Sequence, residues 1–326
     1  MARLATRLTQ QLRLEHPVLS APMALAAGGA LAAAVTRAGG LGLIGGGYGD
    51  GAWLENEFAQ AGNTRVGCGF ITWALAQRPQ LLAAALAHRP AALMLSFGDP
   101  KPFAAEIAAA DVPLICQCQS LDHVRQALDA GAAIVVAQGS EAGGHGHRRA
   151  TLPFVPEVAD LLARESPDTL LLAAGGIADG RGLAASLMLG ADGVLVGTRF
   201  WASREALVHT RHHAAALAAT GDGTVRSALP DIARRLDWPK PFDIRVADNG
   251  FTRRWAGRDD ELRAAIEQEA PAYRAAFAAG DAENAAVVFG EAAGLVGDVP
   301  PAGEIVTRMV DEAVLLLGEK ARGFLA

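Results

Sequence analysis

The sequence predicts a closed (β/α)8 TIM barrel with a smaller, mainly helical insertion or lid near its C-terminus. Apolar, strand-like runs alternate with amphipathic helical stretches from residue 17 to about 200. The runs are apolar on both faces, as in parallel strands that face a barrel interior on one side and helices on the other. The turn after the first run lacks the G-x-G-x-x-G spacing of a Rossmann sheet, so a barrel is the better interpretation.

The elements of the barrel follow one another in a regular order. We expect strands at residues 18–23, 41–45, 65–71, 91–97, 112–118, 132–138, 170–174 and 193–196. We expect the intervening helices at residues 30–38, 52–61, 77–88, 102–109, 121–130, 156–164 and 180–189. Gly39, Gly131 and Gly190 stand just past the last apolar turn of their helices, where a left-handed residue commonly ends a helix and leads into the next strand.

The pattern changes after Phe200. Residues 204–290 are richer in Arg, Trp and Asp and are typical of helices with turn-like interruptions, which predicts a lid over the C-terminal face of the barrel. The amphipathic segment 304–317 is expected to pack back on the barrel. We therefore divide the chain into a barrel domain (1–203), a helical substrate or lid domain (204–290) and a C-terminal segment that returns to the barrel (291–326).

Composition and charge argue against several classes of protein. The chain has 326 residues, 51% of them hydrophobic, so it can bury a large core. A net charge of −6 with scattered basic residues argues against nucleic-acid binding. Cys68, Cys116 and Cys118 cannot form a disulfide framework and are interpreted as small buried residues. The sequence shows neither a signal peptide nor an apolar run of about 20 residues, so we expect a cytoplasmic protein without membrane contact.

The ends of the predicted strands carry few charged groups. In a barrel of this kind, binding and catalytic residues lie at the C-terminal ends of the strands. Here these ends carry small, amide and glycine residues: Ala21, Pro22, Met23, Gln117, Gln138, Gly175, Gly176, Gly197 and Thr198. Strand ends with few charges suit a large planar cofactor that is held by one phosphate at the last two loops. This combination of a planar ring and a phosphate indicates FMN.

A histidine follows the sixth predicted strand. The run from Gln138 to His145 is Gln-Gly-Ser-Glu-Ala-Gly-Gly-His, and His147 lies two residues further on. An imidazole at a strand end is a candidate base, although a loop histidine bonded to the backbone is the alternative. His147 has the opposite orientation and is expected to be exposed or to lie behind the site. No cluster of carboxylates accompanies the two histidines in this loop, so we do not expect a metal site.

Several other aromatic residues leave two interpretations open. Trp73, Trp201, Trp238 and Trp255 are each able to line an apolar substrate pocket or simply to pack in the core. The adjacent His212 and His213 lie in an Ala-rich helix and are expected to be solvated.

The motifs at the strand ends resemble those of one flavoenzyme family. The segments 21–23, 139–147, 173–177, 190–198 and 290–295 resemble the nitronate monooxygenases, formerly called 2-nitropropane dioxygenases. The match covers most of the chain in order and is weakest between about 205 and 285. The resemblance implies FMN, with Pro22 and Met23 against the isoalloxazine ring and His145 beside flavin N5 as catalytic base or acid. It also implies phosphate contacts from Gly175, Gly176, Gly197 and Thr198, and ribityl and ring-edge contacts from Gln138, Gly143 and Gly144.

The chain departs from the family pattern at two positions. Gly69 stands where many members carry Asn, which removes a polar group that faces the flavin. Glu291 stands where Gln is frequent, which adds a charge near the mouth of the barrel. Gln117 falls where many relatives carry Lys or another polar residue. These departures bear on the choice of substrate more than on the choice of cofactor.

The function expected from this pattern is FMN-dependent oxidation of an alkyl nitronate or nitroalkane by O2, giving a carbonyl compound and nitrite. The first alternative is an NAD(P)H-dependent FMN reductase of a quinone or enoyl thioester, whose dinucleotide site would need donors such as Arg211, Arg234, Arg235, Arg253 and Arg254. The second alternative is a flavin-free, phosphate-binding lyase or isomerase. The expected partners are a small-molecule substrate and O2, and the sequence leaves a homodimer open.

Overall fold

The predicted barrel is confirmed by the computed structural model, which describes residues 3–323. Eight parallel strands close in the order β1-β2-β3-β4-β5-β6-β8-β9. Their bounds are Val18–Ser20, Leu41–Gly45, Gly67–Ile71, Leu93–Ser96, Leu114–Cys118, Ile134–Gln138, Leu170–Ala174 and Gly193–Val196. Each falls inside the range expected from the sequence. β1 stops at Ser20, so Ala21, Pro22 and Met23 belong to the loop above the barrel.

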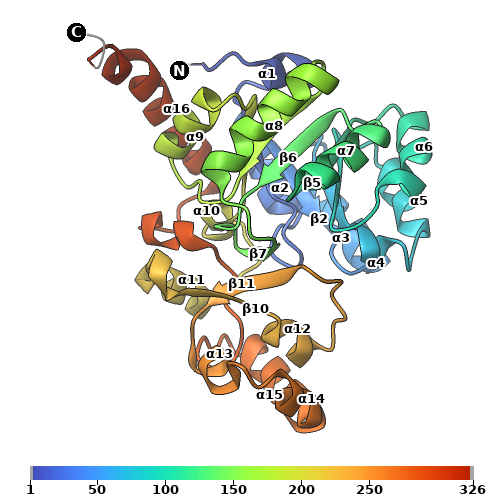
Figure 1. Cartoon of the computed structure of the whole chain (residues 1–326), viewed down its shortest axis with the longest axis vertical. Coiled ribbons are helices and arrows are strands. Elements are labelled where there is room, and N and C mark those ends of the chain that lie inside the picture. The colour runs from blue at the N-terminus through green and yellow to red at the C-terminus, as the bar shows by residue number, and fades with distance from the viewer. Residues whose placement is uncertain (1–2, 324–326) are drawn as a thin grey trace.

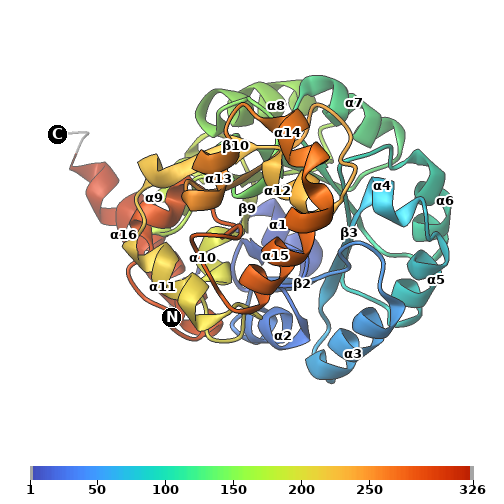
Figure 2. The same cartoon turned by 90° about the horizontal axis from the view of Figure 1, so that it is seen from below.

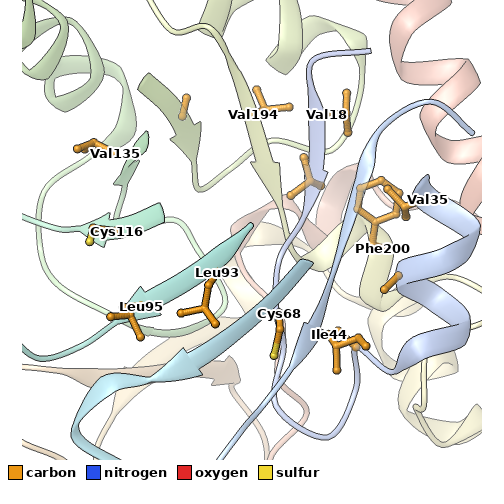
Figure 3. Close-up of a cluster of buried hydrophobic side chains, with 14 of the residues drawn as sticks. Val18, Val35, Ile44, Cys68, Leu93, Leu95, Cys116, Val135, Val194 and Phe200 are labelled. Carbon is orange, nitrogen blue, oxygen red and sulfur yellow. The ribbon is translucent and has the colours of Figure 1, made fainter. Parts of the chain in front are cut away.

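Alternate residues of each strand face the two sides of the barrel wall. The interior is filled by one apolar cluster that includes Leu19, Leu43 and Met94, and their strand neighbours belong to a larger cluster between the strands and the helices. Figure 3 shows part of this outer cluster, in which Val18 and Ile44 lie near Val35 and Phe200, while Leu93 and Cys116 belong to strands further round the barrel.

The three cysteines are buried and free, as expected from the sequence. Cys68, Cys116 and Cys118 all belong to the apolar cluster outside the strands. Burial raises the pKa of both Cys68 and Cys116 to about 12, so these thiols stay protonated at neutral pH.

A ring of helices surrounds the strands (Figures 1 and 2). It comprises α2 (Gly29–Arg37), α3 (Gly51–Ala61), α5 (Gln80–Ala87), α6 (Lys101–Ala109), α7 (Leu121–Asp129), α8 (Thr151–Glu165), α9 (Gly180–Met188) and α16 (Ala302–Leu315). The side chains of Asp50, Ser120 and Asp179 accept hydrogen bonds from the first backbone N–H groups of α3, α7 and α9. Because α16 packs against both α9 and α2, the C-terminal segment closes the ring.

The helix after β6 begins five residues earlier than expected. α8 starts at Thr151, although Pro153 and Pro156 argue for a later start. Pro153 is tolerated because it lies in the first turn, where backbone N–H groups have no intrahelical acceptor.

The segment between the barrel and α16 lies over one end of the barrel (Figures 1 and 2). It contains α11 (Thr210–Ala218), β10 (Thr224–Ser227), α12 (Leu229–Arg234), β11 (Asp243–Ala247), α13 (Gly250–Trp255), α14 (Asp259–Ala264) and α15 (Ile266–Ala278). A separate apolar cluster that includes Phe251, Trp255 and Tyr273 forms its core. We refer to residues 204–290 as the lid. β10 and β11, which alternate Val and Ile with polar residues, are strands in a segment that was expected to be mainly helical.

Short elements complete the chain: α1 (Arg7–Leu12), α4 (Thr72–Leu75), β7 (Gly144–Gly146), α10 (Thr198–Trp201), the 3-10 turns η1 (Gly221–Gly223) and η2 (Glu291–Leu295), and the π-helical turn η3 (Leu316–Lys320). β7 joins the lid strands in an antiparallel sheet of order β10-β11-β7, which ties the lid to the loop after β6. Within residues 3–323, each helix is either too short or too polar to cross a lipid bilayer.

Candidate functional site

A cavity of about 290 Å³ lies where the lid meets the C-terminal ends of the barrel strands. The lid contributes Arg234, Trp238, Ile244 and Phe277 to its wall. Every site residue expected from the sequence borders this one cavity: Ala21, Pro22, Met23, Gln117, Gln138, Gly143, Gly144, His145, Gly175, Gly176, Gly197 and Thr198. The barrel topology accounts for this convergence, since the C-terminal ends of all eight strands meet at the same face.

Two glycines after β8 form one side of a backbone cradle that could hold an anion. Gly175 and Gly176 have φ values of +104° and +72°, a backbone conformation that side chains rarely allow. A Cβ atom on Gly175 would lie 2.9 Å from Thr151 Oγ1 and 3.0 Å from the carbonyl oxygen of Gly139. The backbone therefore approaches the neighbouring loop as closely as a glycine permits.

The loop after β9 forms the other side of this cradle. Thr198 is the first residue of α10, so its backbone N–H has no acceptor within that helix. The Thr198 hydroxyl oxygen accepts a hydrogen bond of 2.9 Å from the backbone N–H of Gly290, which leaves the hydroxyl proton available to donate. Backbone N–H groups and one hydroxyl can together hold a phosphate without a cationic side chain.

A carboxylate lies beside the cradle and is already bonded within the protein. The Glu141 carboxylate accepts from the Thr151 backbone N–H at 2.9 and 3.1 Å and from the Thr151 hydroxyl at 2.8 Å. This contact caps the N-terminus of α8, where the helix dipole stabilises a negative charge. The glutamate of the glycine–histidine motif thus fixes the loop against α8.

Gly69 and Gly143 allow close packing around the cavity. A Cβ atom on Gly69 would lie 2.4 Å from Pro22 Cγ, so the absence of a side chain at position 69 makes room for the Pro22 ring. A Cβ atom on Gly143 would lie 2.5 Å from the backbone nitrogen of Gly290. Glycine at position 69 therefore has a steric reason in this chain.

Two arginines of the lid hold the loop that carries the histidine. The Arg226 guanidinium donates to the carbonyl oxygens of Ser140, Ala142 and Gly144 at 2.8, 3.1 and 3.3 Å. Arg245 donates to the Ser140 carbonyl at 3.0 Å. Burial, with a contribution from Arg245, lowers the pKa of Arg226 to about 10, so the guanidinium remains charged at neutral pH.

His145 lies in β7 opposite Ile244 of β11, and only 8% of its surface is exposed. Its Nε2 atom is 2.8 Å from Asp231 Oδ2, and its ring stacks on Trp238 with centroids 3.3 Å apart and an interplanar angle of 8°. Burial lowers the pKa of His145, and the Asp231 carboxylate offsets only part of this effect. The imidazole is therefore neutral at pH 7 and able to accept a proton.

The amide groups near His145 form a chain of hydrogen bonds. Gln138 Nε2 donates to the His145 carbonyl at 3.1 Å, and Gln138 Oε1 accepts from Gln119 Nε2 at 2.9 Å. Gln119 is buried and was not singled out from the sequence. Gln138 thus has one amide hydrogen left to donate toward the cavity.

An aromatic cluster covers the other face of the site. Trp238 Nε1 donates to the Tyr48 hydroxyl at 3.1 Å, and the Phe97 and Trp73 rings lie edge-on to Trp238 with centroids 5.1 and 5.4 Å away. Of the four tryptophans that the sequence left ambiguous, Trp201 and Trp238 line the cavity, Trp73 lies behind Trp238, and Trp255 belongs to the lid core.

Two expectations about other histidines have different outcomes. His147 is half-buried next to Arg148 and Arg226, which together with burial lower its pKa. The expectation that His212 and His213 are solvated is wrong for His212: 4% of its surface is exposed, it borders the cavity, and its ring lies 5.4 Å from that of Phe277. The packing of α11 against α15 buries a residue that an Ala-rich helix alone would leave at the surface. His213 is half-buried, with Nε2 3.0 Å from the Trp201 carbonyl oxygen.

Sequence reasoning missed Asp231 and named Arg234 only as a candidate donor to a dinucleotide, although both are central to the environment of His145. Arg234 Nη2 lies 2.5 Å from Asp231 Oδ1, and Asp231 is 4% exposed. The only local signal is the Asp-x-x-Arg spacing, which places both side chains on one face of a helix. Their proximity to His145, 86 residues away from Asp231, depends on the lid strands that pair with β7.

Comparisons with known proteins find relatives that match over most of the chain. A sequence profile of the family described as nitronate monooxygenase matches residues 71–312. The nitronate monooxygenase of Neurospora crassa is 32% identical over 341 aligned residues, which cover 91% of this chain and 88% of the relative. FabK from Thermotoga maritima superposes with a TM-score of 0.85 at 30% identity and covers 98% of this chain and 99% of its own. The nitroalkane oxidase from Streptomyces ansochromogenes gives a TM-score of 0.77 at 26% identity and covers 98% and 100% of the two chains.

Proposed function

This chain belongs to the nitronate monooxygenase family of flavin-dependent oxidoreductases, and we propose that it uses FMN and O2 to convert alkyl nitronates, or the parent nitroalkanes, to a carbonyl compound and nitrite. One observation carries the proposal. A buried, neutral imidazole borders a cavity whose opposite side is a cradle of glycine backbone and one threonine hydroxyl. This arrangement combines a base with a site for a phosphorylated planar cofactor.

The residues at the cavity fit FMN. Gly175, Gly176, Gly197 and Thr198 would hold its phosphate, and an added Cβ atom on Gly175 would crowd Gly139 and Thr151 in this cradle. Ala21, Pro22 and Met23 would lie against the ring, while Gln117, Gln138, Gly143 and Gly144 would contact its edge and ribityl chain. When bound, FMN would supply the electron transfer and the reaction with O2.

The protein contributes proton transfer, orientation and exclusion of water. The neutral His145 imidazole would accept the acidic α-proton of a nitroalkane, or hydrogen-bond a nitronate that is already ionised. Trp238 and Phe97 enclose this end of the cavity, so the substrate would lie in an apolar environment between the aromatic cluster and the strand ends.

A reductase of an enoyl thioester or quinone is the second candidate, favoured by the likeness to FabK. It would need a site for a nicotinamide dinucleotide on the lid. Several of the lid arginines that could bind its phosphates pair with carboxylates of the lid: Arg234 with Asp231, Arg235 with Glu267, Arg253 with Glu283 and Arg254 with Glu269. This pairing favours the oxidation of nitronates.

An anaerobic absorbance titration of the purified, FMN-loaded protein distinguishes the candidates. The proposal expects reduction or semiquinone formation of the flavin when a nitronate is added alone, and a slow response to NADH or NADPH. Rapid bleaching by the nicotinamide alone would assign the protein to the reductases. A protein that shows no flavin spectrum after incubation with FMN would contradict both candidates and leave the flavin-free barrel.

A further inference from the structure

We propose that Asp231 is a positioning residue for His145, holding the proton on Nε2 so that Nδ1 is the basic atom that faces the substrate. The inference deepens the proposed function, because it rests on His145 as the base. It also assigns to the lid a part in the chemistry that occurs at the barrel.

The first argument is the direction of the hydrogen bond. An ionised carboxylate can only accept, so the contact of 2.8 Å between His145 Nε2 and Asp231 Oδ2 requires the proton to be on Nε2. The Arg234 guanidinium, which carries only donors, lies 2.5 Å from the other oxygen, Oδ1, so this oxygen also acts as an acceptor. Both members of the His145–Asp231 pair are buried, which strengthens the interaction between them.

The second argument is the fixed plane of the imidazole. Trp238 stacks on the ring at a centroid distance of 3.3 Å, and Trp238 is itself anchored by its hydrogen bond to Tyr48. A half-turn of the ring about the Cβ–Cγ bond would replace Nε2 by Cε1 beside Asp231, and the ring would have to pass through orientations that break this stack. Within residues 3–323, no protein group bonds to His145 Nδ1, and His145 borders the cavity. Nδ1 is therefore the nitrogen that remains for the substrate.

The third argument is the charge created by proton transfer. When Nδ1 accepts a proton, His145 becomes an imidazolium that is already paired with Asp231. The other charged groups that act on the ring are Arg234 and Arg226, and the titratable Tyr48 is hydrogen-bonded to Trp238, which stacks on the ring. Both arginines disfavour the imidazolium, so Asp231 is the group that stabilises it.

The effect of removing the carboxylate charge has a definite sign. Asp231 raises the pKa of His145 against burial and the two arginines. The substitution Asp231→Asn would therefore lower this pKa further and move the acidic limb of the pH profile to lower pH. It would also make the imidazole a weaker base and remove the carboxylate that keeps its proton on Nε2. For both reasons kcat/KM for a neutral nitroalkane should fall by at least about tenfold. A substitution that only perturbed the fold would not shift the acidic limb in this direction.

The test is long-range ¹H–¹⁵N NMR of FMN-loaded protein labelled with ¹⁵N-histidine, with His145 assigned by the loss of its signals in His145→Asn. We expect the wild-type protein to carry the His145 proton on Nε2, and Asp231→Asn to give a mixed or reversed tautomer with a lower pKa. Asp237→Asn removes the same charge from an exposed position on the same segment and serves as the control. A proton on Nδ1 in the wild-type protein would overturn the proposal, and this measurement needs no variant of Asp231.

The same experiment separates this inference from the proposed function, because the tautomer is observed without substrate. If the proton is on Nε2 and Asp231→Asn shifts it, while neither nitroalkanes nor nitronates are turned over, Asp231 positions His145 for a different reaction. If the tautomer and the acidic limb of the pH profile are unchanged in Asp231→Asn, the positioning role is refuted even in an active nitronate monooxygenase.

Discussion

The glycine cradle gives a prediction that isolates one backbone contact. Gly175 and Gly131 both have positive φ values, +104° and +76°. An alanine at either position would suffer the same kind of backbone strain, about 1–2 kcal/mol. They differ in their surroundings: the new Cβ atom at position 131 meets nothing within 4 Å, whereas at position 175 it meets Thr151 Oγ1 at 2.9 Å and Gly139 O at 3.0 Å. Gly131→Ala is therefore a matched control for Gly175→Ala.

The magnitude follows from these contacts. Overpacking against backbone atoms costs about 1–3 kcal/mol beyond the strain, because Gly139 cannot yield without moving the loop that leads to His145. A shift of the cradle would weaken at least one hydrogen bond to the charged phosphate, and such a bond contributes about 1.5–3 kcal/mol. We expect the dissociation constant of FMN to rise about 10- to 100-fold in Gly175→Ala. It should stay near the wild-type value in Gly131→Ala.

The assay is a titration of apoprotein with FMN, followed by quenching of flavin fluorescence, together with thermal unfolding of each apoprotein. Both variants should unfold at lower temperature than the wild-type protein, and Gly175→Ala at the lowest. An FMN affinity of Gly175→Ala within twofold of the wild-type value would refute the placement of the phosphate at the end of β8.

Two further substitutions test the walls of the cavity. Gly69→Asn places a side chain against Pro22, whose Cγ atom would lie 2.4 Å from the new Cβ. We therefore expect the free energy of unfolding, measured with urea, to fall by about 1–3 kcal/mol, and the flavin spectrum to change. Unchanged stability would show that the Pro22 loop is free to move. Arg226→Met removes hydrogen bonds to the carbonyls of Ser140, Ala142 and Gly144, so amide hydrogen exchange at Gly144–Gly146 should accelerate while exchange in β8 stays slow. Equal rates in the two proteins would mean that the pairing of β7 with β11 alone holds the loop.

The barrel could be predicted because its signals are local. Strands such as Ile134–Gln138 are short apolar runs, and glycines such as Gly131 mark the helix ends that precede them. The convergence of Gly175, Thr198 and His145 then follows from the topology, since all strand ends of a parallel barrel meet at one face.

The parts that could not be predicted depend on contacts between distant segments. Gly144–Gly146 has no intrinsic preference for a strand, and it forms β7 because β11 pairs with it. Asp231 reaches His145 from 86 residues away, through the fold of the lid. His212 is buried for a similar reason, since α15 supplies the Phe277 ring that packs on it. The candidate base, His145, can thus be recognised from its motif, whereas the residues that contact its side chain can be identified only from the tertiary structure.

The measurement that tests the central claim most directly compares two substrates of one variant. His145→Asn removes the base and keeps the glycine cradle, so the protein should retain FMN. We expect kcat/KM for neutral nitroalkanes to fall by about 10²–10⁴-fold, while activity on preformed nitronates, which need no deprotonation, falls far less. An equal loss on both substrates, with FMN still bound, would contradict the assignment of His145 as the base.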